Sequence, residues 1–451
     1  MSRKLFGTDG IRGVAGEFPL DLGTVFAIGL ALGHHLSHED RRPRVVIGQD
    51  TRESSAWIAD RLSDGLRAAQ TEVTSAGVIT TPGIAYLARE LGFDAGVVIS
   101  ASHNPWTDNG IKVFGGDGYK LSDELELAIE KEIFRFIETH REVTAVVPNI
   151  PSLPGDHSLR EKYETWLKQK VSTPKLKGTL VIDCANGAAS ACAPELFKVL
   201  GLDAELIHHK PTGKNINDHC GALYPQVVAD EVKKRGAALG ITFDGDADRA
   251  LFADCNGNVI NGDAVLLMAA RDLQLRGELT SDTVVATTMS NMGLEAALKR
   301  SGIRMLRAQV GDKYVLDEMR KTGAVLGGEQ SGHIIFSRTA TTGDGLLTAL
   351  IVLEILSRNG KQLDELVSDL KVFPQVIKNV RVREKQPLDQ IASVSSAIRA
   401  AEQDLAGNGR VVVRYSGTEP LARVMIEAES KDKMEKHAES ISGAIRAAIG
   451  A

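Results

Sequence analysis

Two kinds of apolar pattern alternate along the chain. Short runs rich in β-branched residues predict strands, and they lie at residues 44–48, 95–100, 179–183, 239–243, 283–288 and 324–328. Longer stretches with helical spacing lie between them, at residues 54–70, 121–140, 226–236, 262–276, 291–301 and 344–358. Such an alternation is typical of mixed or parallel α/β layers.

The pattern changes near residue 371. The chain from 371 to 451 contains the strand-like runs "KNVRVRE", "RVVVRYSG" and "ARVMIEAES", a helix near 387–403 and a terminal helix. This order predicts a small α+β unit with an antiparallel sheet. Two further boundaries are predicted at the proline-rich segment 146–156 and at the polar turn 254–258. Together with the change near residue 371, they divide the chain into four predicted domains, which span residues 1–150, 151–255, 256–370 and 371–451.

Composition excludes several classes of function. The net charge of −6 and the pI near 6.0 give no basic footprint, so neither a nucleic acid nor an anionic membrane is an expected partner. The longest apolar run, residues 346–356, is too short to span a bilayer and contains Glu354. The N-terminus lacks the apolar core of a signal peptide, which predicts a cytoplasmic protein.

The four cysteines form no CxxC pair and no zinc pattern. They are expected to be small buried residues of a protein in a reducing compartment. They are Cys184, Cys192, Cys220 and Cys255.

The segment "FDGDADRA" follows an apolar strand and carries Asp244, Asp246 and Asp248. On an extended chain alternate side chains share a side, so three carboxylates would crowd together. Two carboxylates 4 Å apart repel by as much as about 4 kcal/mol at an effective dielectric of 20, and a hard cation such as Mg²⁺ would relieve this. A calcium EF-hand is excluded, because Arg249 and Cys255 stand where its glycine and glutamate belong. A solvated acidic turn is the alternative.

The segment "VVISASHNPWTDNGIKVF" places Ser102, His103 and Lys112 just beyond another buried strand. Ser102 is not in a GxSxG elbow, and by itself a turn or cap serine is the better interpretation. Neighbouring residues on a strand face opposite ways, so His103 is not expected to act as a simple base for Ser102.

The segment "AVLGGEQSGHIIF" lies between two predicted strands. Glu329, Ser331 and His333 alternate there among glycines, which suits the binding of sugar hydroxyls. A hairpin turn with a core histidine is the alternative.

The segment "VRYSGTEPLARV" offers a phosphate two arginines, two hydroxyls and a glycine turn. A plain turn with surface arginines is equally compatible. No complete Walker loop or GxGxxG is present, since "PTGKNIN" lacks the first glycine and the Ser/Thr. The residues concerned are Arg414, Ser416, Gly417, Thr418 and Arg423.

Three further segments give weaker signals. "FGTDGIRG" places Arg12 in a glycine-bounded loop, and "VGDKYV" places Lys313 at an expected helix start. "GQDTRESS", residues 48–55, follows a strand and is expected to cap the next helix.

Taken together, "ISASHNP", "DGDADR", "GEQSGH" and "RYSGTEP" resemble the motifs of the α-D-phosphohexomutases, in the same order and over the whole chain. "FGTDGIRG" and "GEQSGH" resemble those of the bacterial phosphoglucosamine mutase branch. The resemblance implies three related mixed α/β domains around a central cleft and a smaller C-terminal α+β domain. It also implies a mutase that interconverts glucosamine 6-phosphate and glucosamine 1-phosphate, through a sugar bisphosphate, and supplies UDP-N-acetylglucosamine synthesis.

The resemblance also assigns roles to residues. Ser102 would carry the phosphoryl group and complete a Mg²⁺ site with the three aspartates. Phosphoserine and three carboxylates bring about −5 of charge against +2 from the ion, so nearby cations are expected. Lys112 and Arg12 would supply them, with Lys112 and His333 as the candidates for proton transfer.

The remaining site residues follow from the same resemblance. Sugar hydroxyls would contact Glu329 and Ser331, and the loop of residues 414–418 with Arg423 would hold the phosphate that does not react. The other expected contributors to the substrate site are Arg249 and Lys313, with His103 and Asn104 in support.

Other functions are left open by the residues. A phosphoglucomutase or phosphomannomutase would share all these chemical groups. A metal-dependent serine phosphatase, or a silent sugar-phosphate binding protein, is a more distant alternative. A homodimer is compatible with the sequence.

Overall fold

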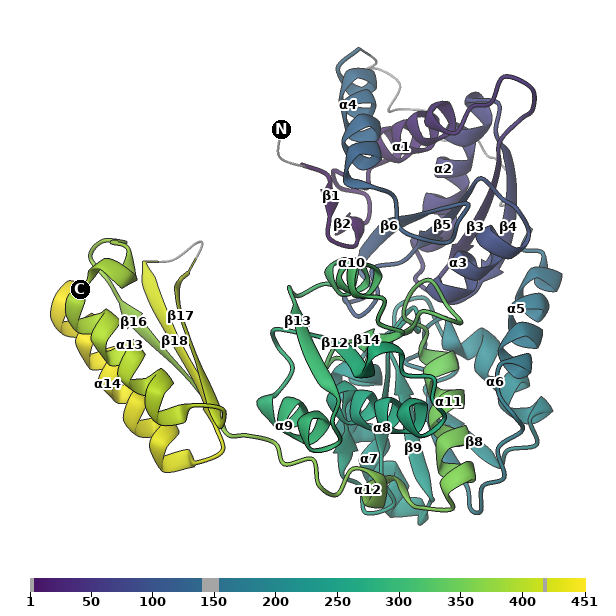
Figure 1. The fold of residues 1–451 in the computed structure, drawn as a ribbon. Coiled ribbons are helices and arrows are strands. Elements are labelled where there is room, and N and C mark those ends of the chain that lie inside the picture. Colours follow the sequence, from purple (N-terminus) through teal and green to yellow (C-terminus); the bar gives the residue numbers. More distant parts are fainter. Residues whose placement is uncertain (1–3, 140–153, 417–419) are drawn as a thin grey trace. The chain divides into compact units, whose positions relative to one another are not determined.

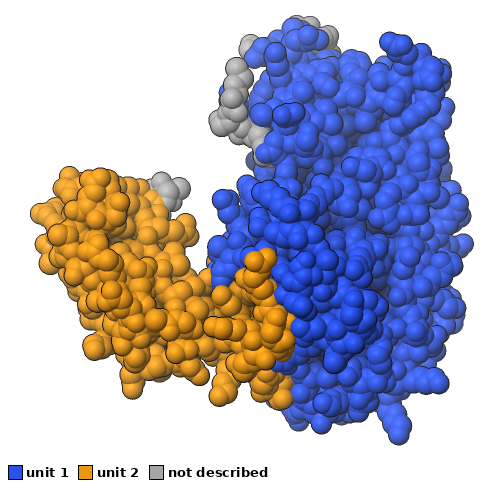
Figure 2. Space-filling view, in the orientation of Figure 1, with its two compact units in different colours: residues 1–288, 306–366 blue, residues 289–305, 367–451 orange. Residues whose placement is uncertain are grey.

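The structure is a computed structural model that describes residues 4–139, 154–416 and 420–451. The chain divides into two compact units, which are coloured separately in Figure 2. The first comprises residues 1–288 and 306–366, and the second comprises residues 289–305 and 367–451.

The first unit begins with a six-stranded mixed sheet (Figure 1). β4, β3 and β5 run parallel, and β6, β2 and β1 add antiparallel strands beside β5. In sheet order the strands are β1 (Phe6–Gly7), β2 (Gly10–Val14), β6 (Asp108–Gly115), β5 (Ala95–Ile99), β3 (Arg44–Gln49) and β4 (Glu72–Val78). The helices are α1 (Leu22–His35), α2 (Ser55–Ala68), α3 (Thr81–Glu90) and α4 (Asp123–Thr139).

Helices cover both faces of this sheet. α1, α2 and α4 share one apolar core with the side chains of Val45, Ile47 and Val97. On the other face, Gly48 and Gly96 let α3 approach closely, because a Cβ at either position would come within 2.8 Å of Ile84. This packing fixes the end of β5, after which Ser102 lies.

A five-stranded sheet forms the second layered region. Its parallel strands β8, β7 and β9 are followed by antiparallel β10 and β11, and α7 packs its valines against the sheet. The strands are β11 (Val259–Ile260), β10 (Ala250–Ala253), β9 (Leu239–Phe243), β7 (Leu180–Asp183) and β8 (Ala204–Ile207). The helices are α5 (His157–Gln169), α6 (Ala189–Val199) and α7 (Pro225–Arg235).

A third sheet has four strands. β12 and β14 are parallel, β15 returns antiparallel, and Val315 and Met319 of α10 pack on the sheet. The strands are β13 (Arg304–Ala308), β12 (Thr283–Thr287), β14 (Leu326–Gly328) and β15 (Ile334–Phe336). The helices are α8 (Gly262–Leu275), α10 (Asp312–Thr322), α11 (Gly345–Asn359) and α12 (Leu363–Leu366).

The second unit is built on an antiparallel three-stranded sheet. α13 and α14 cover one of its faces, where Val424, Ile426 and Ile441 are fully buried. α9 belongs to the same unit, and the N–H of Met292 at its start donates to Oε1 of Glu427. The strands are β16 (Gln375–Arg381), β18 (Leu421–Ala428) and β17 (Gly409–Tyr415), and the helices are α9 (Met292–Arg300), α13 (Ala392–Leu405) and α14 (Lys431–Ile449).

The expected α/β class with a smaller C-terminal α+β unit is confirmed. Every strand and helix predicted over residues 44–358 is present, with ends shifted by a residue or two. The limits of the four predicted domains and the central cleft stay predictions. Among the described helices, none combines the length and the apolar character needed to cross a bilayer.

Two local expectations are wrong. Cys255 is exposed rather than buried, because it lies in the turn between β10 and β11, whereas the other three cysteines are buried. The segment 48–55 does not cap α2, since the N-cap residue Ser54 makes no side-chain cap hydrogen bond. Asp50 of this segment instead accepts hydrogen bonds from Ser55 and Ser100.

Candidate active site

Ser102 lies in the turn that follows β5 and has a left-handed backbone. Its φ is 51°, and its side chain is buried. The Oγ donates to Oδ2 of Asp244 at 2.5 Å and lies 3.3 Å from Nδ1 of His103. The expectation that His103 faces away from Ser102 is therefore wrong, because these residues form a turn rather than a strand. Burial and Arg249 lower the pKa of His103, so this ring is neutral.

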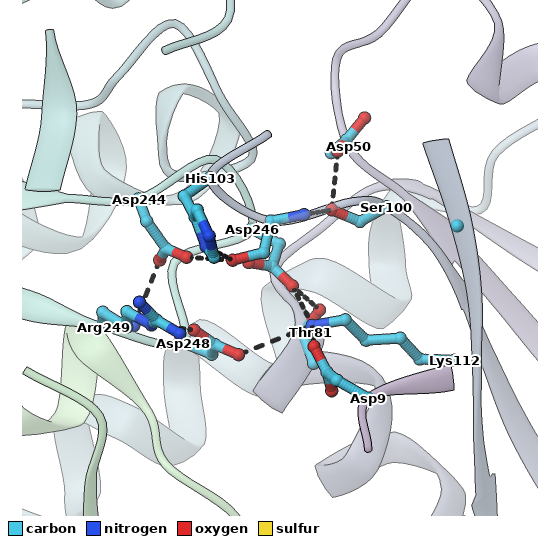
Figure 3. Close-up of polar contacts among 12 residues, drawn as sticks. Asp9, Asp50, Thr81, Ser100, His103, Lys112, Asp244, Asp246, Asp248 and Arg249 are labelled. Atoms are coloured by element: carbon cyan, nitrogen blue, oxygen red, sulfur yellow. Dashed lines mark hydrogen bonds and ion pairs between the residues drawn. The ribbon is translucent and has the colours of Figure 1, made fainter. Parts of the chain in front are cut away.

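The three aspartates gather as expected, although for a different reason. They lie in the loop between antiparallel β9 and β10, where Ala247 has a φ of 56°, and not on an extended strand. One carboxylate oxygen from each of Asp244, Asp246 and Asp248 lies within 4.8 Å of the others, and all three residues are buried (Figure 3). The turn, not strand alternation, brings the carboxylates together.

This triad has the chemistry of a site for a hard divalent cation. Oδ1 of Asp246 and Oδ1 of Asp248 are buried and have no hydrogen-bond partner among the residues that the structure describes. Burial and the two neighbouring carboxylates raise the pKa of Asp244 well above its ordinary range. A cation such as Mg²⁺ would satisfy the orphaned oxygens and offset the repulsion, so these residues fit the ion.

Lys112 supplies positive charge directly beside the triad. It lies on β6 with its side chain buried, and its Nζ lies 2.8 Å from Asp246, 2.9 Å from Asp9 and 3.5 Å from Asp248 (Figure 3). Burial alone would lower the pKa of Lys112, but Asp246, Asp9 and Asp248 raise it well above its usual value. Lys112 is therefore held as a cation.

A series of alternating charges continues from Asp9. Nζ of Lys120 bridges Oδ1 of Asp9 and Oδ2 of Asp312, at 2.6 Å from each. Oδ2 of Asp312 lies 3.9 Å from Nε2 of His333, and Nδ1 of His333 lies 3.6 Å from Asp248. The series thus returns to the triad and forms a closed ring of charges, whose members come from five separate stretches of the chain.

His333 has partners in both of its protonation states. The neutral ring can accept the N–H of Gly343 at Nε2, over 3.1 Å. Burial lowers the pKa of the ring, but the carboxylates of Asp248 and Asp312 outweigh this and raise it to about 9. A ring that is stabilised with and without its second proton is suited to proton exchange.

A cavity of about 400 Å³ opens beside the triad. Glu329 lines it from the β14–β15 turn and accepts from the N–H of Gly311 and from Oγ of Ser331, both at 3.0 Å. Ser331 thus supports Glu329. The predicted residues that line this cavity are Arg12, His103, Asp248, Arg249, Glu329 and His333.

Lys313 lies in different surroundings. It is the second residue of α10, as expected for a helix start, and it forms an ion pair with Asp123. It lines a separate cavity of about 430 Å³ with Lys120 and Arg320. The structure does not bring Lys313 to the cavity that Glu329 lines.

The residues predicted to hold the phosphate belong to the second unit. Arg414 on β17 lies directly opposite Arg423 on β18, and the adjacent Val413 and Val424 pack in the core beneath α13 and α14. The two arginines therefore share the other face of the sheet, where like charges repel unless an anion lies between them. Ser416 follows β17, whereas Gly417 and Thr418 lie outside the described residues.

Sequence reasoning missed several residues of this site. Asp9, Lys120 and Asp312 carry the ring of charges, and Thr81 donates from its Oγ1 and its N–H to Asp246. Nothing in the sequence around Lys120, Asp312 or Thr81 distinguishes it from an ordinary polar residue, because only the fold brings it to the triad. For Asp9 one signal was available, because it stands three residues before Arg12 in "FGTDGIRG" and the two form an ion pair.

A second cluster of ligand-type side chains has a structural explanation. Ligand atoms of Asp183, His208 and Cys220 lie within 4.8 Å of one another. The Asp183 carboxylate already accepts the N–H groups of Ala185 and Gly221, at 2.9 Å each, and lies 3.1 Å from Nδ1 of His208. These bonds fix the loops around Asp183.

Comparison with known families gives a match over nearly the whole chain. The family described as phosphoglucomutase/phosphomannomutase matches in four segments. Its α/β/α domains I, II and III match residues 3–140, 161–257 and 261–373, and its C-terminal domain matches residues 377–444.

Individual relatives agree with this match. A phosphoglucosamine mutase of Koribacter versatilis (strain Ellin345) is 64% identical over 452 residues, which cover 99% of this chain and 98% of that protein. A solved phosphoglucomutase/phosphomannomutase family protein from Burkholderia thailandensis has a TM-score of 0.79 at 25% identity, over 98% of this chain and 97% of its own. An Aspergillus fumigatus N-acetylphosphoglucosamine mutase, solved with GlcNAc-6P and magnesium, has a TM-score of 0.62 over 99% of this chain and 96% of its own, and at 19% identity it shows the fold alone.

Proposed function

Because the chain belongs to the phosphoglucomutase/phosphomannomutase family, in its phosphoglucosamine mutase branch, we propose that Ser102 carries the phosphoryl group of a mutase that acts on glucosamine phosphates. The resemblance found in the sequence is confirmed, and with it the class of enzyme, an isomerase that works by phosphoryl transfer. One observation supports the role of Ser102 above all. Its Oγ lies in the turn after β5 of the first sheet. It is 2.5 Å from a carboxylate oxygen of Asp244, which follows β9 of the second sheet.

The proposed reaction has two transfers. Phosphorylated Ser102 gives its phosphoryl group to O1 of glucosamine 6-phosphate, which forms a bisphosphate. The bisphosphate turns end for end, and its 6-phosphoryl group returns to Ser102 as glucosamine 1-phosphate is released. Such transfers depend chiefly on positioning and on charge stabilisation, which Lys112 and the other buried cations would provide.

The triad would hold Mg²⁺ through Asp244, Asp246 and Asp248, with a phosphoserine oxygen beside them. A bound Mg²⁺ would offset the charge that develops on the transferring phosphoryl oxygens. The orphaned Oδ1 atoms of Asp246 and Asp248 support this assignment. Lys112 and Thr81 hold Asp246 in place from the side of the first sheet.

Two residues are candidates for the group that exchanges the hydroxyl proton. Lys112 is held as a cation by its carboxylate partners, which suits it to charge stabilisation. His333 has a pKa of about 9, nearer to neutral pH, and has partners in both protonation states. We therefore assign proton exchange to His333 and electrostatic stabilisation to Lys112.

The substrate would be held by two groups of residues. Glu329, supported by Ser331, would bind sugar hydroxyls, while Arg12 and Arg249 line the same cavity and would face the reacting phosphate. In the second unit, Arg414, Ser416 and Arg423, together with Gly417 and Thr418, would bind the distal phosphate. The paired arginines on one sheet face support this role.

A comparison of substrates tests the proposed function. Purified protein with Mg²⁺ and catalytic glucose 1,6-bisphosphate should convert glucosamine 6-phosphate faster than glucose 6-phosphate or mannose 6-phosphate. A preference for glucose 6-phosphate would indicate a phosphoglucomutase, and a preference for mannose 6-phosphate would indicate a phosphomannomutase. Release of inorganic phosphate without isomerisation would indicate a phosphatase. A cytoplasmic location, a homodimer and a place in UDP-N-acetylglucosamine synthesis stay predictions.

A further inference from the structure

We infer that Arg52 and Asn217 form a clamp on the backbone carbonyls of Ser102 and Asn104, and that this clamp holds the Ser102 hydroxyl in its reactive position. The two residues come from segments 48–55 and 211–217, which the proposed reaction does not otherwise use. They act as positioning residues through the backbone of Ser102. The inference rests on the proposed role of Ser102 as phosphoryl carrier.

Arg52 holds the turn from the side of the first sheet. Its Nη2 donates to the carbonyl of Ser102 at 3.0 Å and to the carbonyl of Asn104 at 2.6 Å. The guanidinium is completely buried and forms an ion pair through Nη1 with Asp50. Asp50 also accepts from Oγ of Ser100, at 2.6 Å (Figure 3). Oγ of Ser100 in turn accepts the N–H of Ser102 at 2.9 Å. Arg52 is therefore oriented by the same small network that fixes the start of the turn.

Asn217 holds the same two carbonyls from the second sheet's loops. Its Nδ2 lies 2.9 Å from the carbonyl of Ser102 and 3.1 Å from that of Asn104. Asn217 is buried, and its own N–H donates to the carbonyl of Ala185 at 2.9 Å. The two carbonyls thus receive four hydrogen bonds from side chains that lie 165 residues apart in sequence.

The turn needs these hydrogen bonds because its backbone has an unfavourable conformation at Ser102. Ser102 has a φ of 51°, a conformation that an L-residue with a Cβ rarely adopts without support. The carbonyl of Ser102 also lies so close to Gly245, beside the triad, that a Cβ on Gly245 would come within 2.4 Å of it. If the carbonyl were released, rotation of this peptide would move Oγ of Ser102 away from Asp244.

Arg52→Lys and Asn217→Asp are the variants that test the clamp. Lysine keeps the ion pair with Asp50 but lacks the forked donors. Aspartate keeps the shape and tolerates the φ of 58° at position 217, but its carboxylate offers no N–H. Arg61→Lys is the matched control. Arg61 has a side chain that is only 12% exposed, and like Arg52 it donates to a backbone carbonyl, that of Leu22, away from the site.

The decisive measurement is the single-turnover rate at which glucose 1,6-bisphosphate phosphorylates Ser102, followed by intact mass. Each variant should slow this transfer by about 10²-fold, the effect of a displacement of about 1 Å in a reacting group. The KM for glucosamine 6-phosphate and the Kd for Mg²⁺ should stay near the wild-type values. The melting temperature should fall, because hydrogen bonds to buried carbonyls are lost, but each variant should keep a cooperative unfolding transition. The double variant should lose less than the product of the single losses, because both residues act on the same carbonyls.

The outcomes separate this inference from the proposed function. If wild-type Ser102 takes no phosphoryl group, the proposed function fails, and the clamp with it. If the wild type is phosphorylated and both variants react as fast as Arg61→Lys, the clamp is refuted while the proposed function stands. Losses that multiply in the double variant would show two independent effects and would also refute the clamp.

Discussion

Oγ of Ser102 donates a hydrogen bond to Oδ2 of Asp244 across 2.5 Å, although 142 residues separate the two in sequence. The serine follows a strand of the first sheet, and the aspartate follows a strand of the second. A phosphoryl group on Oγ would thus lie beside three buried carboxylates. Such a group can be kept there only with a divalent cation and basic side chains nearby, which is the arrangement that Lys112 and its neighbours supply.

Replacement of the proposed carrier should stop the reaction and spare the fold. Ser102→Ala removes the only atom that forms the covalent bond, so we expect turnover of glucosamine 6-phosphate to fall to background. The melting temperature should fall only slightly, because alanine leaves no large cavity and Asp244 loses a single hydrogen bond. A coupled assay and a thermal melt check this, and appreciable turnover in the variant would refute the covalent role.

Metal binding should be visible as stability. Mg²⁺ at about 100 times its Kd should stabilise the protein by about 2.7 kcal/mol, since the ion binds the folded triad. Asp246→Asn removes a carboxylate with an orphaned oxygen and should abolish most of this gain. Asp203→Asn, at an exposed residue that accepts from Thr179, is the control. Thermal melts in EDTA and in Mg²⁺ measure the shift, and an equal gain in Asp246→Asn would exclude the triad as the site.

The arginine pair of the second unit should matter for binding rather than for folding. Arg414→Ala removes a charge-assisted contact worth about 1.5–3 kcal/mol, so the KM should rise roughly tenfold to 150-fold. Stability should stay equal or increase slightly, because Arg414 lies opposite Arg423. Steady-state kinetics and a thermal melt test this prediction. Arg383→Ala is the control, because the guanidinium of Arg383 donates to the carbonyl of Ala448. An unchanged KM would oppose the phosphate assignment.

A carboxyl outside the site should govern part of the pH dependence of stability. Burial raises the pKa of Glu164 on α5 from 4.5 to about 7, and its Oε1 has no hydrogen-bond partner among the described residues. A raised pKa in the folded state means that the protonated group stabilises the fold fully below pH 4.5, and that this contribution is lost as the pH rises through 7. Glutamine does not ionise, so Glu164→Gln does not lose this stability as the pH rises. The melting temperature of the variant, relative to that of the wild type, should therefore increase from pH 5 to pH 8. A difference that stays constant with pH would show that Glu164 ionises normally.

The sequence predicted the chemistry of the site better than its geometry. Ser102, the three aspartates and Lys112 were found because each follows or lies on a strongly apolar strand, where a charged residue is conspicuous. Their local conformations could not be predicted, since the left-handed φ of Ser102 and the loop of the aspartates depend on contacts between two sheets. The alternation rule therefore failed for His103, which lies in a turn.

Residues whose function depends on distant partners were missed altogether. Lys120 stands in an ordinary polar segment, and nothing near it in sequence shows that it will bridge Asp9 and Asp312. Arg52 and Asn217 were noticed only as members of an expected helix cap and of an incomplete phosphate loop. Such roles follow from topology, because strand order decides which side chains meet at the ends of β5 and β9.

The most direct test of the whole account is the intact mass of the purified protein with mapping of the modified residue. After incubation with glucose 1,6-bisphosphate, we expect the mass of one phosphoryl group, located on Ser102. A chase with glucosamine 6-phosphate should then remove this group and form a sugar bisphosphate. Full mutase turnover in a protein whose Ser102 never carries the phosphoryl group would contradict the account.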